Sequence, residues 1–313
     1  MRIGLLSARI GGWHARDLER AAAAAGLEIV PMDSRNLQGR VEEVVGKSQA
    51  PDGPGILCGP VDPSTLDAVL VRSIPAGSLE QVVFRMDALH RLLASGVPVI
   101  NPPAAIEACV DKYQALARLA AAKLPVPRTR VTESAAQAQA DFLELGGDAV
   151  VKPLFGSGGR GMIRLSDPDL ADRAFRTLER LGHVIYQQEF VPLRRGDLRV
   201  LVVGREAAAA MRRVGGAVPA DSRARVPDWR TNVARGGRAS PHTLTAEEAE
   251  MAARAAIAVG AEVAGVDLLP AADDRLLISE VNSAPGWRAL AKASGTDVAA
   301  LVLEQVRRVA LRR

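Results

Sequence analysis

The sequence predicts an α/β (α+β) protein in which a parallel N-terminal lobe is followed by lobes built on antiparallel strands. Residues 1–100 alternate apolar strand-like runs with amphipathic helices, which is the pattern of βαβ units around a parallel sheet. A glycine-rich hairpin at 149–165, and strands joined by short turns from residue 184 onward, favour antiparallel pairing in the remainder. A chain of 313 residues is long enough for two or three compact lobes.

Glycines mark the ends of the elements in the N-terminal lobe. The run RIGLLSA is expected to be the first strand, and the alanine-rich segment after it to be a helix that Gly26 ends. A second amphipathic helix ends at Gly96, and the glycine- and proline-rich stretch 50–63 is expected to be loop. Strands are expected at 2–8, 27–30, 66–71 and 97–101.

The later elements are bounded by prolines and by a helix cap. Pro125 and Pro127 end one helix. Thr245 and Glu248 form a capping-box pattern, in which each side chain satisfies a free backbone N–H at a helix start. Helices are expected at 111–124, 169–181, 246–260 and 294–310, and strands at 149–154, 162–165, 184–191, 197–204, 206–214, 263–270 and 275–282.

The composition, with 48% hydrophobic and 24% charged residues, is that of a soluble globular chain. No apolar run approaches the roughly 20 residues of a membrane helix, and the N-terminal apolar run is too short for a signal peptide. Cys58 and Cys109 offer neither a disulfide framework nor metal-ligand spacing, so we expect a cytoplasmic protein without a membrane partner. A net charge of +4 and an aromatic content of 3% do not argue for nucleic-acid binding.

The segment GSGGRG at 156–161 places four glycines between two strands. The backbone N–H groups of such a loop can approach an anion closely. No GK[ST] follows, as it would in a nucleoside-triphosphate P-loop, and a strand follows where a Rossmann fingerprint requires a helix. The loop is therefore a candidate phosphate-binding segment, and a plain flexible hairpin turn is the alternative.

Two lysines accompany this loop. Lys152 lies inside the preceding strand, where a buried ammonium group needs a negative partner such as a phosphate. The adjacent Pro153 leaves open the alternative that Lys152 lies on an edge strand and faces water. Lys112 lies in the first turn of a helix, where the N-terminus already attracts anions, although a solvated lysine is common there.

The strand YQQEFV places Gln187 and Glu189 on one face and Gln188 and Phe190 on the other. Its polar groups and backbone amides could hold the edge of an adenine ring. A half-exposed strand would show the same pattern.

Three oxygen-bearing side chains predict a metal site. Glu280 and Asn282 share one face at the end of an apolar strand that Pro285 and Gly286 terminate. Asp267 lies in another apolar strand, where its carboxylate needs a partner unless it is an ordinary strand-end residue. If the two strands pair, the three side chains converge on a hard-cation site that water and phosphate would complete.

Arginines are concentrated just before the strands of this metal site. The forked guanidinium group of arginine suits a carboxylate substrate. Arginine is also the usual basic residue of this chain, so any single arginine could be an ordinary surface residue. No Ser-His-Asp or nucleophilic cysteine pattern is evident. The arginines are Arg199, Arg212, Arg213, Arg230, Arg235 and Arg238.

In this order the motifs resemble the ATP-grasp superfamily, and within it the RimK-like α-L-glutamate ligases. VVKPLFGSGGRGM is similar to the phosphate lysine and glycine lid, DLRVLVVG with AMRR and WRTNVARGG to the central core, and EVNSAPG with KASGTDVA to the metal strand and closing helix. The resemblance is strongest from Val150 to Asp297. It implies an ATP-grasp fold with a parallel α/β domain at 1–100, a lid domain at 101–187 and a C-terminal antiparallel-sheet domain at 188–313.

The resemblance also implies residue roles. ATP would be bound by Lys112, Lys152, Gly156, Ser157, Gly158, Gly159, Gly161, Gln188, Glu189, Phe190, Asp197, Arg230 and Asn232. Two Mg²⁺ ions, which Mn²⁺ could replace, would be bound by Asp267, Glu280 and Asn282. Catalytic positions would be Arg212, Arg230 and Asn232, with Arg212 and Arg230 holding the acyl phosphate or the substrate carboxylates.

The implied reaction is an ADP-forming ligation of L-glutamate to the carboxylate of a small-molecule or peptide acceptor. Trp287 and Arg288 differ from the smaller or acidic residues expected in ribosomal-protein modifiers, which favours an acceptor of the tetrahydromethanopterin or methanofuran type. Two alternatives stay open, a ligase for the C-terminal glutamate of a protein and a non-catalytic nucleotide-binding protein. The resemblance further implies a homo-oligomer, a dimer or a tetramer.

Overall fold

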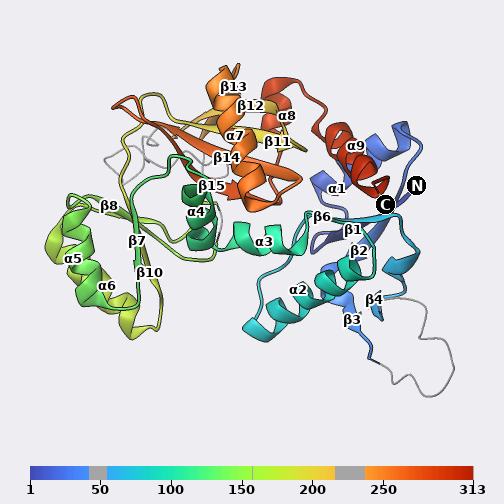
Figure 1. The fold of residues 1–313 in the computed structure, drawn as a ribbon, viewed down its shortest axis with the longest axis horizontal. Coiled ribbons are helices and arrows are strands. Elements are labelled where there is room, and N and C mark those ends of the chain that lie inside the picture. Colours follow the sequence, from blue (N-terminus) through green and yellow to red (C-terminus); the bar gives the residue numbers. More distant parts are fainter. Residues whose placement is uncertain (42–54, 157, 216–236, 313) are drawn as a thin grey trace, which may run out of the picture.

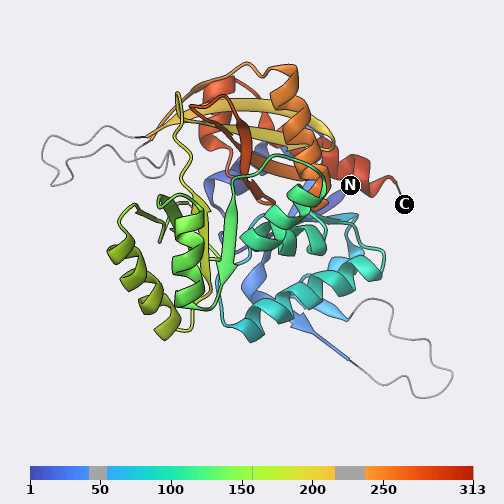
Figure 2. The same ribbon diagram turned by 60° about the vertical axis from the view of Figure 1, so that its left-hand side comes forward.

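The computed structural model describes residues 1–41, 55–156, 158–215 and 237–312, which form three main β-sheets with helices packed against them (Figure 1). In Figure 1 the N-terminal sheet lies at the right, the sheet that carries α5 and α6 at the left, and the C-terminal sheet at the top. Figure 2 shows the same arrangement after a turn of 60°. The predicted mixture of a parallel sheet with antiparallel sheets is confirmed.

The N-terminal sheet is parallel, with the strand order β2-β1-β5-β6. Successive residues of a strand face opposite sides, so Ile3 packs with Leu18 of α1 whereas Leu6 packs with Leu89 of α2. Both faces are therefore covered, as parallel sheets require. The elements are β1 (Arg2–Ser7), α1 (Trp13–Ala24), β2 (Glu28–Asp33), β5 (Ala68–Val71), α2 (Leu79–Ala94) and β6 (Val99–Ile100).

A small two-stranded sheet lies beside this lobe. Strand β3 (Leu37–Gly39) pairs antiparallel with β4 (Ile56–Cys58), and short 3₁₀ helices occupy Ser34–Asn36 and Pro63–Thr65. Strand β4 lies within the stretch 50–63 that the sequence predicted as loop, so that part of the prediction is wrong. Ile56 and Cys58 are buried in the core beneath α2, which is the tertiary contact that makes this short strand.

The second sheet is antiparallel, with the order β7-β10-β8-β9, and the predicted hairpin of β8 and β9 is confirmed. Because β8 lies between β10 and β9, the alternative that Lys152 lies on an edge strand is wrong. Phe142 and Phe175 meet under α5 and α6 with ring centroids 6.2 Å apart. Of these elements, β7 and α5 were not predicted. The elements are β7 (Thr129–Thr132), α5 (Ala135–Glu144), β8 (Ala149–Lys152), β9 (Ile163–Leu165), α6 (Pro168–Arg180) and β10 (Ile185–Glu189).

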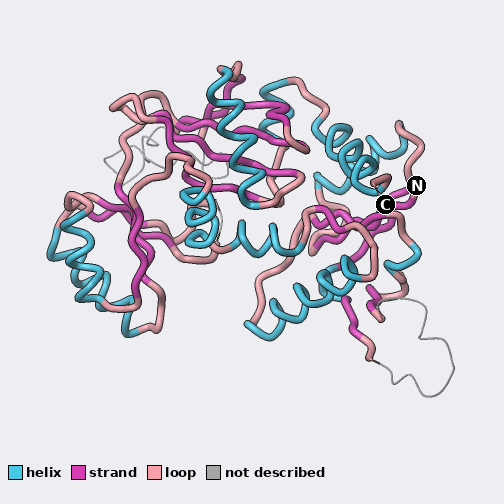
Figure 3. The backbone as a smooth tube through the Cα atoms, in the orientation of Figure 1, coloured by secondary structure: helices cyan, strands magenta, loops and turns pink. Residues whose placement is uncertain are grey.

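The third sheet is antiparallel, with the order β13-β12-β11-β14-β15. One face packs against three helices, and α7 begins at the predicted capping box, where Glu248 N donates to Thr245 Oγ1 at 3.2 Å. Helix α3 was not predicted. The tube in Figure 3 shows these helices beside the sheet. The elements are α3 (Pro103–Val110), α4 (Lys112–Ala121), β11 (Asp197–Val203), β12 (Glu206–Val214), β13 (Arg238–Pro241), α7 (Ala246–Val259), β14 (Val263–Pro270) and β15 (Leu276–Asn282).

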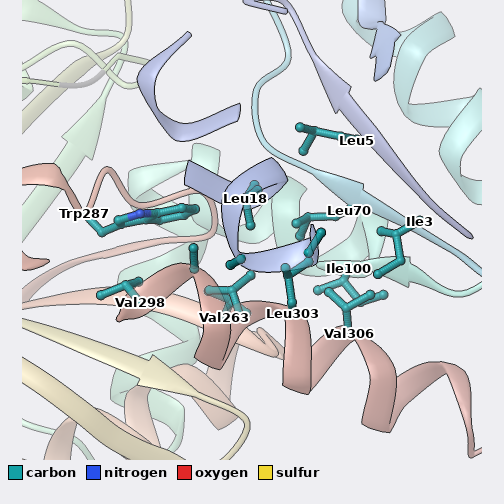
Figure 4. Packing of buried hydrophobic residues seen from close by; sticks show 14 of the residues in the cluster. Ile3, Leu5, Leu18, Leu70, Ile100, Val263, Trp287, Val298, Leu303 and Val306 are labelled. Atoms are coloured by element: carbon teal, nitrogen blue, oxygen red, sulfur yellow. The ribbon is translucent and has the colours of Figure 1, made fainter. Parts of the chain in front are cut away.

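The last two helices, α8 (Arg288–Ser294) and α9 (Val298–Ala310), join the C-terminal sheet to the N-terminal lobe. Figure 4 shows buried side chains of α9 meeting those of the parallel sheet, with Leu303 and Val306 close to Ile100. Trp287 is completely buried in the same cluster. The two ends of the chain therefore share one hydrophobic core.

The predicted domain limits at 100/101 and 187/188 stay a prediction. Helices α3 and α4, from the predicted lid domain, share a core with the C-terminal sheet. Strand β10 crosses the limit at 187/188. No helix in the described part of the chain is long and apolar enough to cross a membrane.

Candidate active site

A cavity of about 500 Å³ lies between the second and third sheets and brings together most of the predicted site residues. Gly161, Asn282 and Arg212 are not among the described residues that line it. Ser157, Arg230 and Asn232 lie outside the described residues. The predicted residues in its lining are Lys112, Lys152, Gly156, Gly158, Gly159, Gln188, Glu189, Phe190, Asp197, Asp267 and Glu280.

Two ammonium groups enter this cavity from different elements. Lys112 begins α4, whose first N–H groups are capped by the Asp111 side chain, and its Nζ donates to Gly156 O at 2.9 Å. Lys152 ends β8, and its Nζ donates to Gln188 Oε1 at 2.6 Å. Burial lowers the pKa of both amines, that of Lys152 to about 8, and the charge of Lys112 adds to the effect on Lys152. Two partly desolvated cations, whose hydrogen-bond acceptors among the described residues are neutral, form a site suited to an anion such as phosphate.

The glycine-rich loop between β8 and β9 requires its glycines. Gly156, Gly158, Gly159 and Gly161 have φ values of 141°, 71°, 68° and 71°, in the region that L side chains rarely adopt. A Cβ on Gly161 would also lie 2.8 Å from Pro153 Cγ. Lys112 holds the base of this loop through Leu154 O and Gly156 O. The loop thus has both a special backbone and a cation that anchors it.

Strand β10 turns the side chains of Gln187 and Gln188 in opposite directions, as predicted. The Gln187 amide turns away and donates to Ala138 O of α5, while Gln188 turns to the cavity and orients Lys152. The Glu189 carboxylate accepts from Arg128 Nε at 2.9 Å and from Arg275 Nη1 at 3.0 Å. Burial acts to raise the pKa of Glu189, but the bonds from these two arginines lower it overall.

The roles predicted for Glu189 and Phe190 at the adenine remain predictions. The Phe190 ring lies beneath Arg164, whose Cζ is 3.5 Å from the ring centroid, and its N–H donates to Asp148 O. Arg128, Arg164 and Arg275 were not singled out from the sequence. Their part in the site depends on partners far away in the chain, so no local pattern indicates it.

The predicted pairing of the metal strands is confirmed. Asp267 of β14 lies directly opposite Glu280 of β15, and Gly265 lies opposite Asn282. A bulge follows at Asp267/Leu268 and sets the register beyond this pair. Asp267 is 5% exposed, and the Glu280 carboxylate makes neither a hydrogen bond nor an ion pair with another described residue. The three side chains therefore occupy one face of the sheet beside the cavity.

Asp267 is neutralised by arginines of the same sheet. Its Oδ2 accepts from Arg199 Nη2 at 3.0 Å and lies 3.0 Å from Arg213 Nη2. Arg213 also makes two bonds to Asp197, at 2.8 and 2.6 Å. Burial acts to lower the pKa of Arg213, but the charges of Asp267 and Asp197 raise it. The result is a buried network of two carboxylates and two guanidinium groups.

One oxygen of this network is left without a hydrogen bond. Asp267 Oδ1 is buried and has no hydrogen-bond donor, although Arg199 Nε lies 2.5 Å away in an unsuitable direction. This oxygen lacks a well-aligned hydrogen bond and belongs to the residue opposite Glu280, so the two carboxylates together offer oxygen ligands that suit a hard cation. Within the described ranges, no three His, Cys, Asp or Glu side chains are placed to hold a metal ion. The protein offers two carboxylates and one amide, and Mg²⁺ commonly completes such a set with water and phosphate.

The structure separates the two neighbouring arginines of β12. Arg213 lines the cavity, whereas Arg212 lies on the opposite face of the strand, with Nη2 3.3 Å from His242 Nδ1. His242 in turn contacts Glu248 at 2.9 Å. The catalytic role predicted for Arg212 remains a prediction, but the geometry favours Arg213. The sequence analysis named both arginines but gave the catalytic role to Arg212, because the strand register that pairs Arg213 with Asp197 was not known.

Comparison with known proteins adds three findings. A sequence profile of the RimK-like ATP-grasp domain matches residues 109–306. Tetrahydromethanopterin:alpha-L-glutamate ligase from Methanosarcina acetivorans is 33% identical, over 98% of this chain and 99% of its own length. A probable alpha-L-glutamate ligase from Haemophilus influenzae is 31% identical, over 70% of this chain and 69% of its own.

Solved structures agree in fold. The ATP-grasp ligase PsnB, in a complex with a minimal precursor, Mg and ADP, superposes with a TM-score of 0.72 and 21% identity. The superposition covers 99% of this chain and 98% of that chain. At this identity the likeness concerns the fold alone.

Proposed function

Because the chain belongs to the RimK-like ATP-grasp family, and its relatives are α-L-glutamate ligases, we propose that it adds L-glutamate to a carboxylate of a one-carbon carrier cofactor. The fold class and the ATP-dependent ligase chemistry predicted from the sequence are confirmed by this membership. The identity of the acceptor goes beyond what family membership establishes. The similarity to the tetrahydromethanopterin enzyme extends over nearly the whole chain, which supports a small pterin-type acceptor over a protein.

The observation that carries the proposal is the gathering of opposite charges in one cavity. Lys112 and Lys152 line it together with Asp267 and Glu280. Cations of this kind suit the phosphates of ATP, and oxygen ligands suit the Mg²⁺ that accompanies them. The two sets of charges also interact, since the charge of Glu280 acts to raise the pKa of both lysines against the effect of burial.

In the proposed site, Asp267, Glu280 and Asn282 would hold Mg²⁺. When bound, the metal supplies positive charge that stabilises the transferring phosphoryl group. We assign two ions to the site, with Mn²⁺ as a substitute. The lysines and the glycine-rich loop would bind the phosphates, together with the predicted contributions of Ser157, Arg230 and Asn232.

The reaction we propose has two steps. An acceptor carboxylate oxygen takes the γ-phosphoryl group of ATP, which gives an acyl phosphate and ADP. The α-amino group of L-glutamate then attacks the acyl carbon, the phosphate leaves and one proton is released. Arg213 is placed beside Asp267 to bind anionic oxygens during both steps, and closure of the glycine-rich loop would exclude the water that hydrolyses an acyl phosphate.

Two further parts of the proposal concern the state of the protein. We propose that it acts in the cytoplasm and as a homo-oligomer, a dimer or a tetramer. Neither a nucleic acid nor a membrane is among the proposed partners.

The test is a ligation assay with purified protein, ATP, Mg²⁺, L-glutamate and either a tetrahydromethanopterin-type cofactor or a small-molecule extract. We expect mass spectrometry to detect an acceptor that has gained one or more glutamyl units, with ADP formed in equal amount. The Asp267→Asn variant serves as the matched control. Glutamylation of a protein fraction alone would instead support the ligase for a protein C-terminus, and ATP binding without ADP formation would contradict ligase activity.

A further inference from the structure

Trp287 occupies an unusual position for a residue just beyond a metal-binding strand. It follows Asn282 by five residues, and its side chain is completely buried. Figure 4 shows the indole beside α1 of the N-terminal lobe, in the same cluster as Leu18. The sequence singled out Trp287 only as a departure that bears on the acceptor, and gave it no structural role in the site.

The N-terminal lobe holds Trp287 through both its backbone N–H and its indole N–H. The Trp287 N–H donates to His14 Nε2 at 3.1 Å, and the indole Nε1–H donates to Asp17 Oδ2 at 2.8 Å. The His14 ring meets the indole edge-on, with centroids 4.8 Å apart. Burial and the charge of Arg72 lower the pKa of His14 to about 4, so His14 is neutral near pH 7 and its Nε2 can accept this bond.

Arg72 holds the same loop from the end of strand β5. Its Nη2 donates to Pro285 O at 2.8 Å, and its Cζ lies 4.2 Å from the centroid of the Trp287 ring. Burial lowers the pKa of Arg72 to about 10, and its buried Nε has no hydrogen-bond partner. A desolvated guanidinium with an unused donor destabilises the fold, so packing alone does not account for it.

A third contact fixes the beginning of the loop. Asn101, at the end of β6, donates through Nδ2 to Ser283 O at 2.5 Å and to Val263 O at 2.7 Å. A Cβ on Gly265 would lie 2.8 Å from Pro285 Cβ, so the glycine opposite Asn282 lets the loop lie close to β14. Residues 283, 285 and 287 are therefore each bound to the N-terminal lobe or to the strand beside the metal ligands.

We propose that Arg72, His14 and Trp287 form a latch by which the N-terminal lobe positions the metal ligands Glu280 and Asn282. The three are positioning residues, since none of them reaches the proposed metal. This inference rests on the proposed function, because it needs the metal site at β14 and β15. Mg²⁺ demands near-ideal octahedral geometry, so a small displacement of its ligand strand weakens binding. A loop fixed at Ser283 and Pro285 leaves Asn282 little freedom to move.

Through the latch, the N-terminal lobe supports the metal site although it contributes no metal ligand. Residues that support metal ligands from outside commonly change metal affinity by about 10–100-fold when they are replaced. A residue that only packs two lobes together would instead change the free energy of unfolding and leave metal affinity in the folded protein unchanged. The two roles therefore predict different measurements.

The test uses Mn²⁺ as the probe and the ADP complex of the full chain. Binding of Mn²⁺ is measured by electron paramagnetic resonance, and thermal unfolding is measured on the same samples without nucleotide. We expect Arg72→Met to weaken Mn²⁺ binding by about tenfold, with affinity for ADP in the absence of metal unchanged. Arg72→Lys should recover part of the loss, because a lysine can still reach Pro285 O. Arg288→Met, which changes the exposed neighbour of Trp287, is the matched control and should bind Mn²⁺ as the wild type does.

Trp287→Phe is the second variant, for the case that Arg72→Met does not fold. It keeps a ring beneath Arg72 but removes the bond to Asp17 and part of the buried indole, and we expect weaker Mn²⁺ binding from it as well. Lower thermal stability with unchanged Mn²⁺ affinity in these variants would overturn the latch and leave the proposed function intact. Absence of Mn²⁺ binding by the wild-type ADP complex would overturn the proposed function, and the latch with it.

Discussion

Asp267 and Arg213 form an ion pair inside the cavity, with Arg213 Nη2 3.0 Å from Asp267 Oδ2, while the other oxygen of Asp267 has no hydrogen bond. The Asp267 carboxylate is thus paired with Arg213 through one oxygen, and its other oxygen lies 2.5 Å from Arg199 Nε. This geometry connects the proposed metal site with the proposed anion-binding arginine. Mutations of Asp267 and of Arg213 can therefore test the two proposed roles separately.

Asp267→Asn should abolish ligation while the protein stays folded. The change removes one negative charge from the metal site but keeps a side chain of the same shape, and Arg213 keeps its two bonds to Asp197. We expect turnover to fall by about 100-fold or more, as measured by ADP release. Asp273→Asn, on the exposed turn between β14 and β15, is the control and should retain full turnover.

Arg213→Ala and Arg212→Ala should differ strongly, although the two residues are neighbours. Arg213→Ala leaves Asp197 and Asp267 buried without their shared counter-charge, which should reduce the free energy of unfolding by about 3–5 kcal/mol and collapse turnover. Arg212→Ala loses one contact to His242, which should cost about 1 kcal/mol and leave turnover largely intact. Urea unfolding and ADP release measure the two effects. A larger loss of turnover in Arg212→Ala than in Arg213→Ala would instead support the catalytic role predicted for Arg212.

Lys152→Met should stabilise the nucleotide-free protein and weaken its ATP binding. The pKa of Lys152 is lowered to about 8 from an ordinary value of 10.5. Between these values the unfolded chain binds a proton that the folded chain has lost, so wild-type stability should rise with pH from about 8 to 10.5.

In Lys152→Met that rise with pH should be absent, and at pH 7 the free energy of unfolding should increase by about 1–3 kcal/mol. Urea unfolding in the presence of a chelator measures both. The increase in melting temperature that ATP causes in the wild type should be lost. Unchanged ATP stabilisation in this variant would contradict a phosphate-binding role for Lys152.

His14 should make the protein less stable in mild acid. Its pKa is lowered to about 4 from 6.5, because burial and the charge of Arg72 disfavour the protonated ring. As the pH falls from 6.5 to 4, the unfolded chain takes up a proton that the folded chain excludes, so the free energy of unfolding decreases over this window. In His14→Gln, whose amide oxygen can accept the Trp287 N–H, the decrease should be smaller, and urea unfolding at several pH values measures it. Equal slopes in both proteins would mean that His14 is not buried as a neutral ring.

Gly196→Ala should distort the site through the backbone of Arg213. Gly196 has a φ of 83°, and an added Cβ would lie 2.0 Å from Arg213 O. We expect a loss of about 2 kcal/mol or more in the free energy of unfolding, together with a loss of turnover.

Gly182→Ala is the matched control for this change. Gly182 has a φ of 67°, and an added Cβ would have nothing within 4 Å. It should cost only the strain of the left-handed conformation, about 1 kcal/mol, with normal turnover. Equal effects of the two substitutions would show that the contact with Arg213 is unimportant.

Local patterns predicted those parts of the site that depend on neighbours in the sequence. The glycines of 156–161, the strand positions of Glu280 and Asn282 and the capping box of α7 follow from period-two alternation, glycine spacing and side-chain chemistry. Elements with weak local signals were missed, namely α3, α5, α8, β3, β4, β7 and β13. Strand β7, for instance, is only four residues long and is formed by its pairing with β10.

The sequence by itself thus determined the family, the glycine-rich loop, the two lysines and the candidate metal ligands, because each is recognised from residues that are close together in the sequence. Only the tertiary structure decided which arginine of β12 lines the cavity and that Arg128 and Arg275 bind Glu189. It alone also decided that Trp287 is hydrogen-bonded to the N-terminal lobe. Each of these depends on strand register or on contacts between residues far apart in the chain. Register places a side chain on one face or the other of a sheet, and a shift of one residue would reverse every such assignment.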